Sequence, residues 1–449
     1  MYKPLLLAAL LSLVLIAPGV AAPPAPAPAS STFDRLIEQL GDTDFRKRDE
    51  ATRLLEAEGV KVVPALKKAL GHPDAEVRRR AFNLIPQLET AAFVAPRRVT
   101  LHMSHKPLRA IFDEMTKQTG YKIEFWTAPN NAQMTYSCDF KDATFWQALD
   151  RLCRDANLVL QHNYGDERII LQNQGGYTPH VQHDGAFRFV PTGFQMVRNM
   201  DFGLVGNAGA SPQRNENLTL TFLVFSEPRI PLLGMGEIRL TAAYDNDKNS
   251  MLVPINNNPN QAIFLGGGFG GGRFISRYGN GNRSYMQQSQ FTLHRPSERA
   301  TRVKLIRGVI PVTLLVEQKP VVVADNILKA KGKKNSVGTT TFHFEDVSAQ
   351  PNKQYQIKLH ITEDNKDNPN DWTWMQTLFQ RIELQDEKGH KFQVYGTRWD
   401  NSSPNNVQVT LTYGAQPNVK TGPPSKFIFQ EWRTLQHQVH FEFKDLPLP

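Results

Sequence analysis

Residues that could do chemistry are few in this chain, and they lack the spacing of the common catalytic motifs. The sequence contains no His-Glu-x-x-His metalloprotease motif, no Gly-x-Ser-x-Gly nucleophile elbow, no phosphate-binding loop and no cysteine spacing typical of zinc sites. His102 and Ser104 would share one face of a strand and could place a base near a hydroxyl, but no acid that would orient the histidine accompanies them. We therefore expect an exposed polar face there, no catalytic residues and no enzymatic activity.

Polar clusters that could bind a metal ion each depart from a working ligand set. The run from Asp245 to Ser250 resembles the opening of a calcium loop, but Ser250 stands where the tight turn requires glycine and Asn256 where a bidentate glutamate should be. A hairpin turn is the simpler interpretation. An acidic loop could hold calcium or be solvated. Of three His-x-x-His pairs, one lies in a linker, and the other two would be divided between the two faces of a strand. These residues are Asp364, Asp367 and Asp371, and the pairs His102 and His105, His180 and His183, and His437 and His440. The sequence predicts no metal site and no cofactor.

Three tryptophans, Trp372, Trp374 and Trp399, form the most suggestive aromatic cluster. The apolar face of a sugar ring matches an indole, so tryptophans near the loop end of a β-sandwich can stack on glycans. The alternative is that they are partly buried and close the end of the sandwich core. They are the candidate glycan-stacking residues.

Two cysteines, Cys138 and Cys153, are the only ones in the chain. Cys138 falls in an alternating strand pattern and Cys153 on the apolar face of a helix, so both point toward one small core. In an oxidising compartment they could form one disulfide, and two free buried thiols are the alternative. So few cysteines exclude a disulfide-built scaffold, and the domains must be stabilised by hydrophobic burial.

The segment 97–173 alternates between strand-like and helix-like patterns. A half-buried strand precedes the helix start Pro107–Phe112, Gly120 ends that helix, and a second helix starts at Thr144–Leu149. The predicted order is β-α-β-β-α-β-β. With its two matching helix starts, the segment resembles the short N-terminal domain of secretins and TonB-dependent receptors. The resemblance implies a periplasmic docking module without catalysis, although the part that inserts in the outer membrane in those families is missing here.

Residues 33–92 carry an internal repeat of thirty residues. The first copy has Leu40-Gly41, Asp44, Arg48, Ala51 and Leu54-Leu55, and the second has Leu70-Gly71, Asp74, Arg78, Ala81 and Leu84-Ile85. An acid at a helix start favours the positive helix end, and a small alanine permits close packing. The segment resembles HEAT repeats, which implies a short helical solenoid. Arg79 and Arg80 are expected to face water.

The rest of the chain consists of short alternating runs separated by Asn, Asp, Gly and Pro, which predicts two antiparallel β-sandwich-like domains at 186–325 and 338–449. The expected strands include 302–306, 312–316 and 320–324 in the first domain, and 426–429 and 438–444 in the second. A Gly-rich segment at 266–283 reads as a loop in the first domain. Each domain has an Ile-x-Leu strand before an acidic turn, at Asp245 and at Asp386, which suggests a duplication.

The N-terminus predicts where the protein works. Residues 1–21 combine Lys3, an apolar run too short to span a bilayer comfortably, and small residues at a cleavage site, which together are typical of a secretory signal peptide. Residues 22–32 form a Pro- and Ala-rich linker. We expect a mature protein that begins at Ala22, is exported to the periplasm or beyond the cell, and has no transmembrane segment after cleavage.

Charge and architecture narrow the function classes. The net charge is +9, but residues 33–92 carry eleven basic and eleven acidic side chains, so the charge is diffuse. Export argues against a nucleic-acid partner. The fold class expected is a short HEAT-like repeat, a small α+β module and two β-sandwich-like domains. The first functional hypothesis is a non-enzymatic protein that docks other proteins of the bacterial cell envelope, and the alternative is a glycan-binding or glycan-processing protein that acts through the C-terminal sandwich.

Overall fold

The computed structural model describes residues 32–126, 134–161, 168–173, 179–201, 213–253, 285–295, 297, 299–364, 373–403, 405–417 and 419–449. The predicted signal peptide, the linker up to residue 31 and the Gly-rich segment 266–283 lie outside these residues. So do Asn256, Asp367, Asp371 and Trp372. The chain divides into two units, 1–92 and 93–449, and β-strands predominate in the second. Among the described residues, no helix combines the length and the apolar character that crossing a bilayer requires.

The first unit consists of two helix pairs. Its elements are α1 (Thr32–Gln39), α2 (Phe45–Glu58), the 3-10 turn η1 (Gly59–Val62), α3 (Val63–Ala69) and α4 (Ala75–Val94), whose last two residues count with the second unit. The core contains the repeated positions Ala51 and Ala81, which are fully buried, as the thirty-residue period predicts.

The second helix of each pair, α2 or α4, begins with the same polar contacts. The carboxylate of Asp44 accepts a hydrogen bond from the backbone N–H of Arg46, and that of Asp74 accepts one from Glu76, so each acid caps its helix. Arg48 donates to the carbonyl oxygens of residues 42 and 43, at 2.8 and 3.1 Å, and Arg78 donates to those of residues 72 and 73, at 2.6 and 2.7 Å. The sequence repeat is therefore a repeat of interactions.

The α+β module opens the second unit. Its elements are β1 (Arg98–Pro107), α5 (Leu108–Thr119), β2 (Ile123–Trp126), β3 (Thr135–Thr144), α6 (Phe145–Asp155), β4 (Val159–Leu160) and β5 (Ile169–Gln172). Strands β1 and β3 pair antiparallel, and β2, β5 and β4 form a second small sheet in which β2 and β5 are parallel. Helix α5 ends at Gly120, which takes a φ of 80°, a conformation that favours glycine.

The β-rich part of the second unit contains three sheets. Its strands are β6 (Gln182–Asp184), β7 (Phe187–Asp201), β8 (Gln213–Ser226), β9 (Leu232–Met235), β10 (Arg239–Asp245), β11 (Met286–Leu293), β12 (Arg302–Asp325), β13 (Lys334–Val337), β14 (Thr340–Gln350), β15 (Gln354–Glu363), β16 (Ile382–Asp386), β17 (Phe392–Ser403), β18 (Asn406–Ala415) and β19 (Pro424–Pro447). Short helical turns lie at η3 (Ile327–Lys329), η4 (Pro351–Lys353) and α7 (Thr373–Leu378). The sheet orders are β11-β8-β7-β6, β10-β12-β19-β16 with β9 also on β12, and β13-β14-β15-β18-β17.

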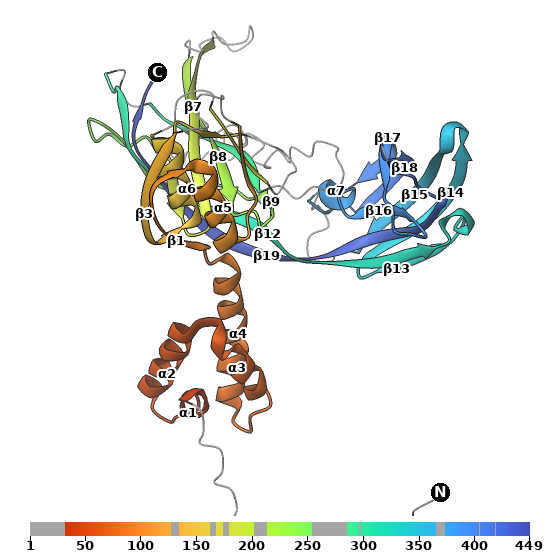
Figure 1. Ribbon diagram of the computed structural model, residues 1–449, viewed down its shortest axis with the longest axis horizontal. Helices are drawn as coiled ribbons and strands as arrows, with labels where there is room; N and C mark the ends of the chain where they lie inside the picture. The colour runs from red at the N-terminus through yellow and green to blue at the C-terminus, as the bar shows by residue number, and fades with distance from the viewer. Residues whose placement is uncertain are drawn as a thin grey trace, which may run out of the picture. The chain divides into compact units, whose positions relative to one another are not determined.

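Strands β12 and β19 each run for 24 residues and pair antiparallel from Arg302 opposite Pro447 to Asp325 opposite Lys426. Figure 1 shows them side by side, leading from one group of strands to the other. The start of β12 and the end of β19 pack with β7, β8 and β11 in the first sandwich, whereas their other halves pack with β14, β15 and β18 in the second.

The ranges 186–325 and 338–449 therefore do not separate the two sandwiches, because each sandwich takes half of a strand from the other range. The strands expected at 302–306, 312–316 and 320–324 are one strand, and so are those at 426–429 and 438–444. The residues between them are not turns, because the ladder between β12 and β19 continues through them with two local register shifts.

The two sandwiches share a strand order, which supports the predicted duplication. Strands β6, β7, β8 and β11 correspond to β13, β14, β15 and β18, while β10 and β12 correspond to β16 and β19. The hairpins that open the sheets both place glycine at positive φ, Gly185 at 57° and Gly338 at 56°. Both sheets then carry a β-bulge at the same place, between residues 191 and 193 and between residues 344 and 346.

The acidic turns also correspond. Asp245 accepts hydrogen bonds from the backbone N–H groups of Asp247 and Asn249, and Asp386 accepts them from Lys388 and His390. Each turn follows the strand at one end of the central sheet, β10 or β16. An equivalent aspartate carboxylate therefore stabilises an equivalent turn in each sandwich.

Candidate functional site

His102 lies on the exposed surface of the α+β module and has an acidic partner that the sequence pattern did not reveal. Its Nδ1 is 2.5 Å from the carboxylate of Asp139, which stands opposite it on β3. The Ser104 hydroxyl instead contacts Nδ1 of His105 at 2.8 Å. The His102 imidazole and the Ser104 hydroxyl therefore bond to different partners, Asp139 and His105.

The Asp245 turn uses its carboxylate for structure. Besides the two backbone donors, the side-chain amide of Asn249 donates to Asp245 at 2.9 Å, and the Asp245 side chain is buried. These bonds hold the turn closed. The run from Asp245 to Ser250 therefore forms a hairpin turn, the interpretation favoured because Ser250 stands where a calcium loop requires glycine.

The two described tryptophans of the predicted glycan-stacking set differ in exposure. Trp374 is 8% exposed and belongs to the core of the second sandwich, so its ring faces are not offered to a sugar. Trp399 is 39% exposed, and its ring meets that of Phe379 edge to face at a centroid distance of 5.0 Å. Trp374 therefore belongs to the hydrophobic core, as expected from the alternative that the tryptophans close the end of the sandwich core.

Both cysteines are free thiols in the structure. Cys153 is buried on α6, and Cys138 is half-buried on β3 against the same core. Burial raises the pKa of both thiols, with the charge of Asp150 adding to the effect at Cys153. Because the thiolate is the reactive form, neither cysteine is placed for chemistry.

We expect a thiol reagent to leave Cys153 unmodified in the native chain, because burial both shields the sulfur and disfavours its thiolate. After denaturation without reductant, mass spectrometry should find two labelled cysteines per chain. Unlabelled cysteines in the denatured chain would instead reveal the disulfide between Cys138 and Cys153.

A buried charge pair joins the α+β module to the first sandwich. The carboxylate of Asp150 on α6 accepts hydrogen bonds from the guanidinium of Arg188 on β7 at 2.8 to 3.0 Å, and it contacts His183 of β6 at 2.7 Å. Burial alone would raise the pKa of Asp150, but the charge of Arg188 and the bonds from His183 and Arg188 lower it overall. The indole N–H of Trp146 donates to the carbonyl oxygen of Ala186 nearby.

A second buried acid, Glu227, joins the same two parts. It accepts hydrogen bonds from the hydroxyl of Tyr121 at 2.7 Å and from the backbone N–H of Arg97 at 3.0 and 3.1 Å. Burial raises the pKa of Glu227 despite these bonds. Val190 and Phe225 of the sandwich complete the apolar core of the module. The module is therefore seated on the sandwich by packing and by two buried acids.

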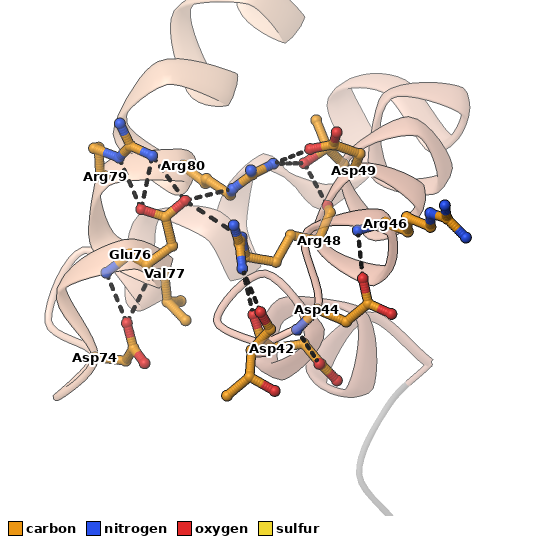
Figure 2. A network of polar contacts seen from close by, with 12 residues as sticks. Asp42, Asp44, Arg46, Arg48, Asp49, Asp74, Glu76, Val77, Arg79 and Arg80 are labelled. Carbon is orange, nitrogen blue, oxygen red and sulfur yellow. Dashed lines mark hydrogen bonds and ion pairs between the residues drawn. The ribbon is translucent and has the colours of Figure 1, made fainter.

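The helical unit carries a network of charged side chains between α2 and α4 (Figure 2). Glu76 accepts hydrogen bonds from Arg79 and Arg80, which lower the pKa of its carboxyl to about 2. Arg80 also donates to Asp49 and to the hydroxyl of Thr52, both on α2. The expectation that Arg80 faces water was wrong, because its side chain is only 19% exposed and links the two repeats.

The second repeat ends differently from the first. Leu40 is fully buried, whereas its repeat equivalent Leu70 is 40% exposed. A side chain at Gly41 would meet Val77 of the next repeat at 2.8 Å, whereas at Gly71 it would meet no atom closer than 3.6 Å. Thr52 contacts Arg80 of the next repeat, but its equivalent Phe82 is 70% exposed. We call Leu70, Gly71 and Phe82 the open end of the helical stack.

A histidine and glutamate cluster on the second sandwich was missed by the sequence patterns. His343 and Glu345 of β14 and His360 of β15 have ligand atoms that all lie within 4.8 Å of one another. The signal that could have found them is the pairing register, which places His343 opposite His360, and no local motif contains it.

The comparisons with known proteins return nothing for this chain. No family model matches it, and neither a curated protein nor a solved structure is a significant match.

Proposed function

We propose that this protein is an exported, non-enzymatic docking protein of the bacterial cell envelope, and that a helical segment of a partner protein binds at the open end of its helical stack. The observation that carries the proposal is the contrast between the two repeats. At the first repeat, the surface around Leu40 and Thr52 is covered by α3 and α4. At the second, the equivalent side chains Leu70 and Phe82 are exposed.

A helical segment is the occupant that this surface favours, because helices of the same chain already occupy the equivalent surface one repeat earlier. Short solenoids expose such ends unless an additional element covers them. Two exposed apolar side chains, one of them a phenylalanine, are also suitable anchors for a protein interface.

The second unit supports the proposal as a scaffold. The α+β module, which resembles docking domains, is fixed to the first sandwich by Asp150 and Glu227. The inner face of the module packs against the sandwich. The exposed surface of β1 and β3 is therefore the part of the module that a partner could contact.

The double variant Leu70→Glu with Phe82→Glu is expected to reduce binding of an envelope protein at least about thirtyfold, because the loss of even one apolar anchor worth about 2 kcal/mol corresponds to that factor. Affinity would be measured for the full chain against the partner purified from envelope extracts. Val322→Glu, which changes an exposed apolar residue of the second unit, is the matched control and should bind normally.

Unchanged affinity in the double variant would contradict the proposal. Retention of the wild-type chain on a polysaccharide instead, lost on Trp399→Ala, would favour the glycan-binding alternative.

A further inference from the structure

His343, Glu345 and His360 lie on the outer face of the sheet β13-β14-β15-β18-β17. Their neighbours in sequence, Phe342 and Phe344, point the opposite way into the core of the second sandwich. His343 and His360 stand opposite each other on adjacent strands, with ring centroids 6.4 Å apart. The sheet therefore holds two imidazoles side by side at fixed positions.

The β-bulge between Phe344 and Asp346 adds the carboxylate. Phe344 pairs with Leu359 and Asp346 pairs with Lys358, so Glu345 is the extra residue in β14. A bulge redirects side chains, and bulges are common next to functional sites. Here it brings a Glu345 oxygen within 4.8 Å of ligand atoms of both histidines.

An independent observation at His360 points to a ligand. The Nε2 atom of His360 is buried and has no hydrogen-bond partner in the structure. A buried polar nitrogen without a partner costs free energy, and a bound cation would remove that cost because a neutral imidazole nitrogen is an electron-pair donor.

The first sandwich shows that its fold does not require these residues. The strand order and the bulge align His343 with Val190, Glu345 with Thr192 and His360 with Leu223. Val190 and Leu223 are buried in the core that the first sandwich shares with the α+β module. Of the two sandwiches, only the second therefore has histidine and glutamate at these positions. In the first sandwich, the equivalent face of the sheet packs against the α+β module.

We propose that His343, Glu345 and His360 bind one divalent transition-metal ion, with Zn²⁺ the best match. Two imidazole nitrogens and one carboxylate oxygen form a zinc ligand set that leaves a fourth position for water or a partner's side chain, whereas Ca²⁺ and Mg²⁺ prefer oxygen ligands. Ligands around a tetrahedral zinc lie roughly 3.4 Å apart. Small side-chain rotations close the remaining gap.

The surrounding charges are compatible with a cation. Lys358 pairs with one oxygen of Glu345 at 2.9 Å, and a carboxylate can keep that pair while its other oxygen binds a metal. Asp346 pairs with Lys331 at 2.8 Å, so it neutralises a second nearby lysine. Lys334, opposite His343 on β13, is exposed and can turn toward solvent.

The test titrates the metal-free full chain with Zn²⁺ alone, followed by calorimetry, and with Co²⁺, followed by the visible absorption of a four-coordinate ion. Wild type should bind one ion per chain at its tightest site. His343→Gln and His360→Gln should each weaken that site at least about tenfold, and the double variant should lose it together with the Co²⁺ absorption.

His102→Gln is the matched control, because it removes a histidine that contacts the carboxylate of Asp139 and should leave the tightest site unchanged. Circular dichroism verifies that every variant is folded. The proposal is overturned if folded wild-type chain binds no Zn²⁺, or if the double variant binds it as tightly as wild type.

Discussion

Replacing Asp150 with alanine is expected to lower the free energy of unfolding by about 3–5 kcal/mol, the range for removing one partner of a buried ion pair. The change leaves the Arg188 guanidinium, which is 8% exposed, without its carboxylate. It also removes the contact with His183 at the junction of module and sandwich. Chemical denaturation of the full chain would measure the loss.

The matched control is Arg433→Ala, which breaks the exposed pair of Arg433 and Glu317 and should change stability by no more than about 0.5 kcal/mol. An equally small change for Asp150→Ala would contradict the structural role of the buried pair.

Acid should remove the contribution of Asp150. Because the pKa of Asp150 is lower in the folded chain than its ordinary value, the folded state binds fewer protons at this group than the unfolded state. Its stabilising effect is therefore present above the unfolded value of about 3.9 and is lost as the pH falls through the lowered folded pKa. The stability difference between wild type and Asp150→Asn should shrink over that range.

Phe441→Ala is expected to destabilise the first sandwich by about 3–5 kcal/mol, although Phe441 lies eight residues before the last residue of the sequence. Its ring packs against those of Phe189, Phe222 and Phe291, all from the first sandwich. This loss of stability is expected because the C-terminal half of β19 packs in the core of the first sandwich, which consists otherwise of strands from earlier in the chain. Denaturation followed by the near-ultraviolet signal would measure it.

Gly308 gives a second measurement of the same packing. A side chain there would meet the Phe441 ring at 2.6 Å, so Gly308→Ala should cost about 1–3 kcal/mol. Gly193→Ala, where a side chain meets no atom within 4 Å, is the control. If both glycine variants were equally stable, the ring would not pack as described.

Local signals in the sequence predicted the elements that depend on neighbouring residues. Pro107 and Gly120 bracket α5, and the repeated Asp and Arg positions mark the starts of α2 and α4. These signals work because caps and turn residues act within one or two turns of the chain.

Sequence could not predict the contacts that depend on strand pairing. His343 and His360 meet through the register of β14 and β15, and His102 meets Asp139 across β1 and β3. The alternating runs at 302–306, 312–316 and 320–324 predicted three strands, yet the ladder with β19 is continuous and passes through Pro311 and Pro320. Trp372, Trp374 and Trp399 were expected near the loop end of a sandwich, but the sequence does not determine which of these rings is buried.

The most direct measurement of the docking proposal places a photoreactive amino acid at position 82 of the full chain in its native envelope. We expect a cross-link to one discrete protein, mapped by mass spectrometry to a helical segment of that partner. The same probe at position 322 should give no such product. Absence of a protein cross-link at position 82, or the same product from both positions, would contradict the assignment of docking to the open end of the helical stack.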